Sequence, residues 1–161
     1  MRVFFDSSAF VKRYMVESGT DAVLAWCDQA TEIGLSGIAL PEIISAFCRL
    51  LREGRITDLQ YRQLKSLLFI DIEDAAICDL TPAVLAQAIS SLENSVLRGM
   101  DAIHIGSAVV LRERGRTRLL CRTRLITSGR RGTAVHVFRG GSMARGFHYR
   151  SRQAGGAMKR R

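Results

Sequence analysis

Residues 1–9 read Met-Arg-Val-Phe-Phe-Asp-Ser-Ser-Ala, and the centre of this stretch decides the fold. Residues 3–5 are apolar, rich in β-branched and aromatic side chains, and followed by small polar residues, which predicts a short buried strand at the centre of a parallel sheet. Asp6 ends this strand, and a buried carboxylate is costly unless its charge is compensated. Because open α/β sheets bind ligands beyond the carboxyl ends of their strands, we expect Asp6 to lie at a ligand-binding edge.

Helical and strand patterns alternate along the rest of the chain. Strands are predicted at 33–36, 117–121 and 134–138, with one more at either 70–72 or 75–78, and helices at 9–14, 21–30, 40–52, 58–69, 82–92 and 100–114. We expect Ser7 or Ser8 to cap the first helix, Thr57 and Thr81 to cap two later ones, and Leu59, Leu64, Leu67 and Leu68 to face inward. This alternation predicts an α/β fold whose central, mostly parallel sheet is covered on both faces.

Length and composition are those of one soluble globular domain. The chain has 161 residues, of which 47% are hydrophobic and 24% charged. No apolar run approaches the ~20 residues of a membrane span, and the N-terminus lacks the layout of a signal peptide, so we expect a cytoplasmic protein. The four cysteines are scattered without a CxxC pair, which favours small core residues over disulfides or zinc ligands.

Charge is distributed very unevenly. Residues 1–111 hold 9 Lys/Arg against 14 Asp/Glu, whereas residues 112–161 hold 15 Lys/Arg against the single Glu113. The net charges are therefore −5 and +14, and the basic part suits contact with a polyanion. Apolar residues are sparse in 140–161, which predicts a disordered Arg/Gly-rich tail that either binds RNA as an arm or is simply solvated.

Three acids are notable for their positions: Asp6 after the first strand, and Glu42 and Asp101 each in the first turn of an apolar helix. Each alone has an ordinary explanation, since a helix dipole favours negative charge at its N-terminus. One strand end and two helix starts can, however, face the same sheet edge, where three carboxylates would repel one another. A hard cation such as Mg²⁺ or Mn²⁺ resolves that conflict, which suggests metal-assisted phosphodiester hydrolysis.

The segments 4–12, 40–46 and 98–104, which contain these acids, resemble the PIN-domain ribonucleases, and among them the VapC-type toxins of bacterial toxin–antitoxin pairs. The resemblance covers residues 1 to about 125. It implies a PIN-like three-layer α/β/α sandwich over residues 1–139 and an endoribonuclease that depends on Mg²⁺ or Mn²⁺. Asp6, Glu42 and Asp101 would form its catalytic metal site, with Ser7 orienting a ligand or a water. The implied partners are RNA, a cognate antitoxin and a second copy in a homodimer.

The chain departs from the family pattern at position 123. A fourth acid is expected there, but the sequence reads Arg122-Thr123-Arg124. Thr123 brings no negative charge, while Arg122 and Arg124 could bind RNA phosphates or repel cations. A catalytically weak or silent PIN-fold protein that binds RNA or an antitoxin is therefore the rival hypothesis. A changed reading frame after residue 120 would explain both the lost acid and the basic tail.

His104 lies one helical turn after Asp101 and so shares its face of the helix. It could contact the edge of the acidic site. A partly buried histidine with a structural role is the more ordinary interpretation.

Overall fold

The computed structural model describes residues 2–113, 117–121 and 136–137, with side chains up to residue 112. Five strands form one sheet in the order β3-β2-β1-β4-β5, and every pairing is parallel. The strands are β1 (Arg2–Phe5), β2 (Glu32–Ser36), β3 (Ala76–Cys78), β4 (Thr117–Cys121) and β5 (His136–Val137). The helices are α1 (Ser7–Phe10), the 3₁₀ turn η1 (Val11–Arg13), α2 (Thr20–Gln29), α3 (Ala39–Arg52), α4 (Asp58–Glu73), α5 (Pro82–Asn94) and α6 (Gly99–Glu113).

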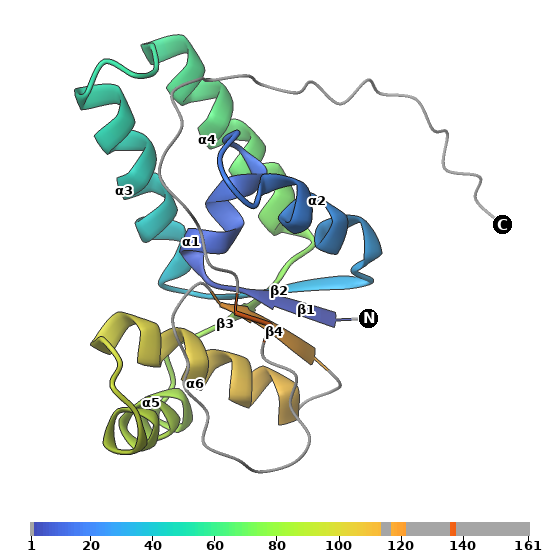
Figure 1. Ribbon diagram of the computed structural model, residues 1–161, viewed down its shortest axis with the longest axis vertical. Helices are drawn as coiled ribbons and strands as arrows, with labels where there is room; N and C mark the ends of the chain where they lie inside the picture. The colour runs from blue at the N-terminus through green and yellow to red at the C-terminus, as the bar shows by residue number, and fades with distance from the viewer. Residues whose placement is uncertain (1, 114–116, 122–135, 138–161) are drawn as a thin grey trace, which may run out of the picture.

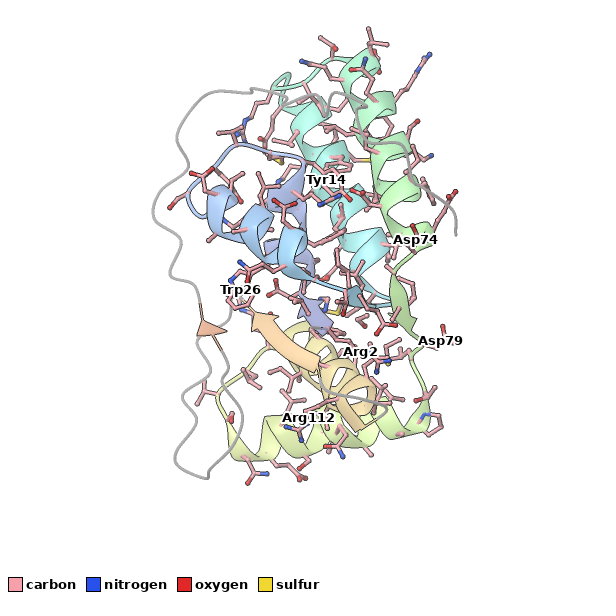
Figure 2. The ribbon with its side chains drawn as sticks, turned by 90° about the vertical axis from the view of Figure 1, so that its right-hand side faces the viewer. Arg2, Tyr14, Trp26, Asp74, Asp79 and Arg112 are labelled. Atoms are coloured by element: carbon pink, nitrogen blue, oxygen red, sulfur yellow. The ribbon has the colours of Figure 1, made fainter. Side chains whose placement is uncertain are left out.

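The sheet lies between two layers of helices (Figure 1). Helices α1 to α4 cover one face, and α5 and α6 cover the other. The side-chain view shows the same division, with Tyr14 on the side of α2 to α4 and Arg112 beside α5 and α6 (Figure 2). The predicted three-layer α/β/α sandwich with a parallel central sheet is thus confirmed.

Strand β1 is buried on both faces, as its apolar composition predicts. Val3 and Phe5 join the larger core, which α1 to α4 complete with Phe10, Phe47 and other side chains. Phe4 points the opposite way and packs against residues of α6. The three apolar residues of β1, Val3, Phe4 and Phe5, are 0% exposed, so this strand anchors both hydrophobic layers.

The strand order places the end of β1 at a topological switch point. The chain moves outward from β1 to β2 and β3, then returns through α5 and α6 to β4 on the other side of β1. Phe5 is in register with Leu35 of β2 and Leu120 of β4, so Asp6 follows at the carboxyl edge between two strands whose connections diverge. This is the position where open α/β sheets form a ligand-binding crevice.

Helices α5 and α6 approach each other closely at Gly106. A Cβ atom added there would lie 2.5 Å from the carbonyl oxygen of Val84 and 3.0 Å from the amide nitrogen of Ala88. No side chain fits at such distances without moving a backbone. Gly106 therefore fixes the packing of the helix that carries Asp101 and His104.

Several local predictions need correction. Asp6, not Ser7 or Ser8, caps α1, because its carboxylate accepts the Ala9 amide. Of the two places predicted for a strand, 75–78 is confirmed by β3 (Ala76–Cys78), whereas residues 70–72 continue α4. Leu59 is 65% exposed because it lies on the outer side of α4, whereas Leu64 and Leu68 are buried as expected.

The predicted caps at Thr57 and Thr81 are confirmed, the first as a complete capping box with Gln60. Cys27 and Cys78 are both buried, in agreement with a core role. None of the helices in the described ranges is long and apolar enough to cross a membrane. Residues 140–161, for which a disordered tail was predicted, lie outside the described residues.

Candidate active site

Asp6 is a buried carboxylate that organises the start of α1. Its side chain is 3% exposed. Oδ1 accepts the Ala9 amide at 2.7 Å, and both oxygens lie 3.1 Å from the Ser8 hydroxyl, which donates to them. These donors offset part of the cost of burying the charge. Asp6 thus combines the roles of helix cap and charged group at the sheet edge.

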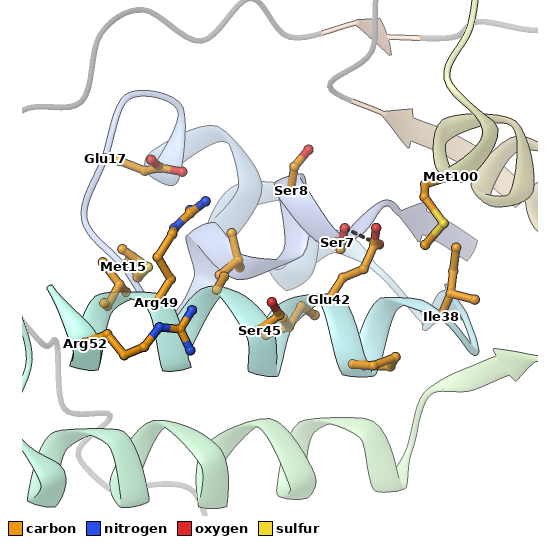
Figure 3. A pocket seen from close by; sticks show the side chains of 15 residues that line it. Ser7, Ser8, Met15, Glu17, Ile38, Glu42, Ser45, Arg49, Arg52 and Met100 are labelled. Atoms are coloured by element: carbon orange, nitrogen blue, oxygen red, sulfur yellow. Dashed lines mark hydrogen bonds between the residues drawn. The ribbon is translucent and has the colours of Figure 1, made fainter.

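Ser7 connects this edge to helix α3. Its Oγ donates a 2.6 Å hydrogen bond to Oε2 of Glu42, which lies in the first turn of α3 (Figure 3). The contact spans 35 positions of sequence and joins the residue after Asp6 to the second predicted acid. The role expected for Ser7, orienting a ligand or water, is untested, but its hydroxyl does orient a carboxylate.

His104 is the second group that holds Glu42. Its Nε2 lies 2.7 Å from the same Oε2 atom, and the residue is 2% exposed. Since a carboxylate only accepts hydrogen bonds, Nε2 must carry a proton here. Nδ1 is buried and has no partner among the residues described, so the neutral Nε2–H tautomer avoids leaving a second N–H donor unpaired. His104 is therefore both buried and in contact with the acidic site.

Asp101 borders the same pocket as Glu42. It occupies the first turn of α6 and is partly exposed, and its carboxylate makes no hydrogen bond or ion pair within the described ranges. Glu42, Met100 and Asp101 line this pocket of about 640 Å³ together with the α5 residues Leu85, Ala88, Ile89 and Leu92. The α6 carboxylate is therefore available to a ligand in that pocket.

Glu42 is the centre of the arrangement, because it lines both this pocket and a second one that lies between α1 and α3. Asp6 lines neither. No group of three or more His, Cys, Asp or Glu side chains in the described part of the chain is arranged to hold a metal ion. The structure brings Glu42 together with Ser7 and His104, places Asp101 on the same pocket, and leaves Asp6 buried one residue away from Ser7.

The donor chemistry nevertheless fits a hard divalent cation. The three predicted acids offer only oxygen ligands, and two border a common pocket with no lysine among its lining residues. Arg98, three residues before Asp101, also lines that pocket and brings a positive charge to it. Residues 122–124, where Arg122, Thr123 and Arg124 were expected to bind substrate, lie outside the described residues and stay predictions.

A second polar network joins Arg13 of η1 and the following Tyr14 to Asp71 of α4. The Arg13 guanidinium contacts both Asp71 oxygens, at 2.6 and 2.7 Å, and the Tyr14 hydroxyl donates to Asp71 at 3.0 Å. Burial and the Asp71 charge raise the pKa of Tyr14, and the hydrogen bond to Asp71 raises the pKa of Arg13. Sequence reasoning missed this pairing, because it joins residues 58 positions apart.

No protein-family model matches the chain. Among characterised proteins it is similar to ribonuclease VapC45 of Mycobacterium tuberculosis CDC 1551 and to ribonuclease VapC49 of strain H37Rv. Both are 32% identical over 117 residues, which is 70% of this chain and 78% of each relative.

Solved structures share the fold at low identity. A toxin–antitoxin complex from Klebsiella pneumoniae aligns with a TM-score of 0.55 at 12% identity, over 75% of this chain and 86% of that one. VapBC2 from Rickettsia felis, crystallised with a promoter DNA fragment, gives 0.52 at 13% identity, over 76% and 89% of the two chains. VapC20 from M. tuberculosis, a toxin that cleaves the sarcin–ricin loop, gives 0.50 at 14% identity, over 74% and 87%. By its similarity to the two curated ribonucleases, the chain belongs to the VapC ribonuclease family.

Proposed function

We propose that this protein is a Mg²⁺- or Mn²⁺-dependent endoribonuclease that acts as the toxin of a toxin–antitoxin pair. Membership of the VapC ribonuclease family supports the reaction class. The single observation that carries the proposal is the Glu42 carboxylate, held by Ser7 and His104 at the sheet edge and facing the pocket that Asp101 also lines. A carboxylate held at an open rim in this way is suited to bind a ligand.

Each residue has a defined role in this proposal. Asp6, Glu42 and Asp101 would hold the cation, which when bound would neutralise charge on a phosphodiester and make a water molecule more acidic. Ser7 and His104 direct Oε2 of Glu42, so that this carboxylate is positioned before the substrate arrives. Arg122, Arg124 and Thr123 would contact the RNA. Asp6 additionally keeps α1 in place through the Ala9 amide.

The proposed partners follow the family. A toxin of this type would pair with a cognate antitoxin, form a homodimer and act in the cytoplasm. The Klebsiella pneumoniae and Rickettsia felis structures are a toxin–antitoxin complex and a VapBC assembly, which supports the antitoxin proposal.

A catalytically weak or silent PIN-fold protein is the second candidate. It is favoured by the lack of a three-residue metal cluster in the described ranges and by Thr123 in place of the expected fourth acid. Such a protein would bind RNA or its antitoxin without cleaving RNA.

Cleavage of RNA by the purified full-length protein separates the two candidates. The proposal predicts cleavage with Mg²⁺ or Mn²⁺, none in EDTA, and none by Asp6→Asn, which keeps an acceptor oxygen for the Ala9 amide. An inactive wild type together with an active Thr123→Asp variant would establish the silent candidate instead.

A further inference from the structure

A pocket of about 600 Å³ runs between α1 and α3, away from the Ser7–Glu42 hydrogen bond (Figure 3). Glu42, Ser45, Arg49 and Arg52 all line it. Their spacing of three, four and three residues places them on one face of α3. The apolar part of the lining includes Val11, Met15, Ile43, Ala46 and Leu50. The pocket therefore has a carboxylate at one end, two guanidiniums at the other, and an apolar floor between them.

The two arginines are available to a ligand. The Arg49 side chain is 57% exposed, and its ion pair with Glu53 is 4.0 Å long and also exposed, so it contributes little. Arg52 makes no ion pair with any described residue. Figure 3 shows Arg49 rising from α3 on the side of the pocket where Ser8 and Glu17 lie.

The remaining acid of this pocket is already neutralised. Glu17 lines it, but its carboxylate pairs at 3.0 Å with Lys12, whose side chain is only 5% exposed. Buried ion pairs are costly to break, because the partner would be left charged in a site without water. Glu17 therefore does not cancel the positive end of the pocket.

The spacing suits a polyanion that also reaches Glu42. At 1.5 Å of rise per residue, Arg49 and Arg52 lie about 10 and about 15 Å along α3 from Glu42. Arginine binds phosphate oxygens in bidentate fashion, and apolar surfaces accept the faces of unstacked bases. A peptide would need acidic side chains at matching intervals, whereas a nucleic acid strand supplies a phosphate at every residue.

We propose that Arg49 and Arg52 form a phosphate-binding subsite for single-stranded RNA that flanks the bond to be cleaved. The inference rests on the proposed function, because it takes the Glu42 end of the pocket as the place of cleavage. The subsite holds the strand along α3 and so contributes to binding, while the acids act on the phosphodiester. Its contribution grows with RNA length until the strand reaches Arg52.

Binding and cleavage are measured separately with the full-length protein. The test protein is the double variant that carries both Arg49→Gln and Arg52→Gln. The control is Arg62→Gln on α4, since Arg62 is exposed and lines neither pocket. Binding of a fluorescent single-stranded RNA 12-mer in EDTA is titrated over a range of salt concentrations. Cleavage with Mn²⁺ is followed for RNAs of 4, 8 and 12 nucleotides.

The double variant is expected to reduce the slope of log Kobs against log salt concentration by about 1.4, since each charge contributes about 0.7 on a single strand. The double variant should raise KM for the 12-mer about tenfold and leave kcat unchanged, and it should cleave the 4-mer at the wild-type rate. The control Arg62→Gln should change the salt slope by at most about half as much as the double variant does.

If the double variant keeps the wild-type slope and KM, the proposed subsite is wrong. If the wild type cleaves nothing but the double variant still loses slope, the proposed ribonuclease activity fails while the RNA subsite stands.

Discussion

His104 Nε2 lies 2.7 Å from Glu42 Oε2, although the two residues are 62 positions apart. The same oxygen accepts the Ser7 hydroxyl at 2.6 Å. One carboxylate oxygen is therefore fixed by a donor from α1 and a donor from α6. The other oxygen, Oε1, accepts no hydrogen bond from any described residue.

Removal of the His104 donor should impair catalysis more than folding. We expect His104→Leu to lower cleavage activity 10- to 100-fold and to raise the Mn²⁺ concentration needed for half-maximal rate, because Glu42 loses its buried partner. His104→Gln retains an N–H donor at a similar distance from the backbone and should recover most of the activity. A purely structural histidine would change the melting temperature but not the Mn²⁺ requirement, so both are measured for each variant.

Gly106 should not tolerate even one added methyl group. A Cβ atom would lie 2.5 Å from Val84 O, and both the Val84 and Ala88 contacts are with backbone atoms that cannot rotate away. We expect Gly106→Ala to lower the free energy of unfolding by about 1–3 kcal/mol in urea titrations.

Gly99→Ala is the matched control for that substitution. Gly99 lies at the start of the same helix, and an added methyl group there would meet no described atom within 4 Å apart from its own chain neighbours and the backbone of its own helix. The stability of this variant should equal or slightly exceed that of the wild type, since alanine favours helix. Equal losses in the two variants would show that the close contact between α5 and α6 is absent in solution.

Stability should fall at alkaline pH because of two buried groups. Burial raises the pKa of the Cys27 thiol above its ordinary 9.0 and, together with Asp71, raises the pKa of the Tyr14 hydroxyl above its ordinary 10.0. At pH 8 and below both groups are largely protonated in the folded and the unfolded chain, so their contribution is fully present. As pH rises further, the unfolded chain releases these protons first, and the folded state loses up to about 1.4 kcal/mol per pH unit for each group.

Urea titrations at pH 8, 9.5 and 10.5 measure this effect. Tyr14→Phe should be less stable than the wild type at pH 8, because it lacks the hydrogen bond to Asp71, but its stability should decline less steeply above pH 10. Parallel declines for the two proteins would mean that the Tyr14 hydroxyl is not buried as described.

The architecture could be predicted well from the sequence because strand composition and helix caps are local patterns. The run at 3–5 has the composition of a buried strand, and Thr57 and Thr81 each stand before a helical pattern that they cap. The cap of α1 was missed because Asp6, Ser7 and Ser8 are all competent to cap, and only the backbone geometry selects Asp6. Residues 70–72 were ambiguous because Ile70-Asp71-Ile72 alternates apolar and polar side chains like a strand but also fits the last turn of a helix.

The site was predicted less completely, since its contacts are long-range. Three acids could be assigned to one sheet edge from their positions after a strand and at two helix starts. The hydrogen bonds of Ser7 and His104 to a single oxygen of Glu42 depend on how α1, α3 and α6 pack, which no local pattern encodes. The Arg13–Asp71 ion pair could not be predicted either, because it also depends on how distant elements pack.

The central claim is that Glu42 belongs to a metal-dependent ribonuclease site, and the rate of RNA cleavage as a function of Mn²⁺ concentration tests it most directly. The wild type, Glu42→Gln and the control Glu93→Gln, an exposed α5 acid that lines neither pocket, are compared. We predict a saturable, EDTA-sensitive rate for the wild type and the control, and a loss of at least 100-fold for Glu42→Gln. Cleavage by Glu42→Gln at the wild-type rate and with the same Mn²⁺ dependence would contradict the account.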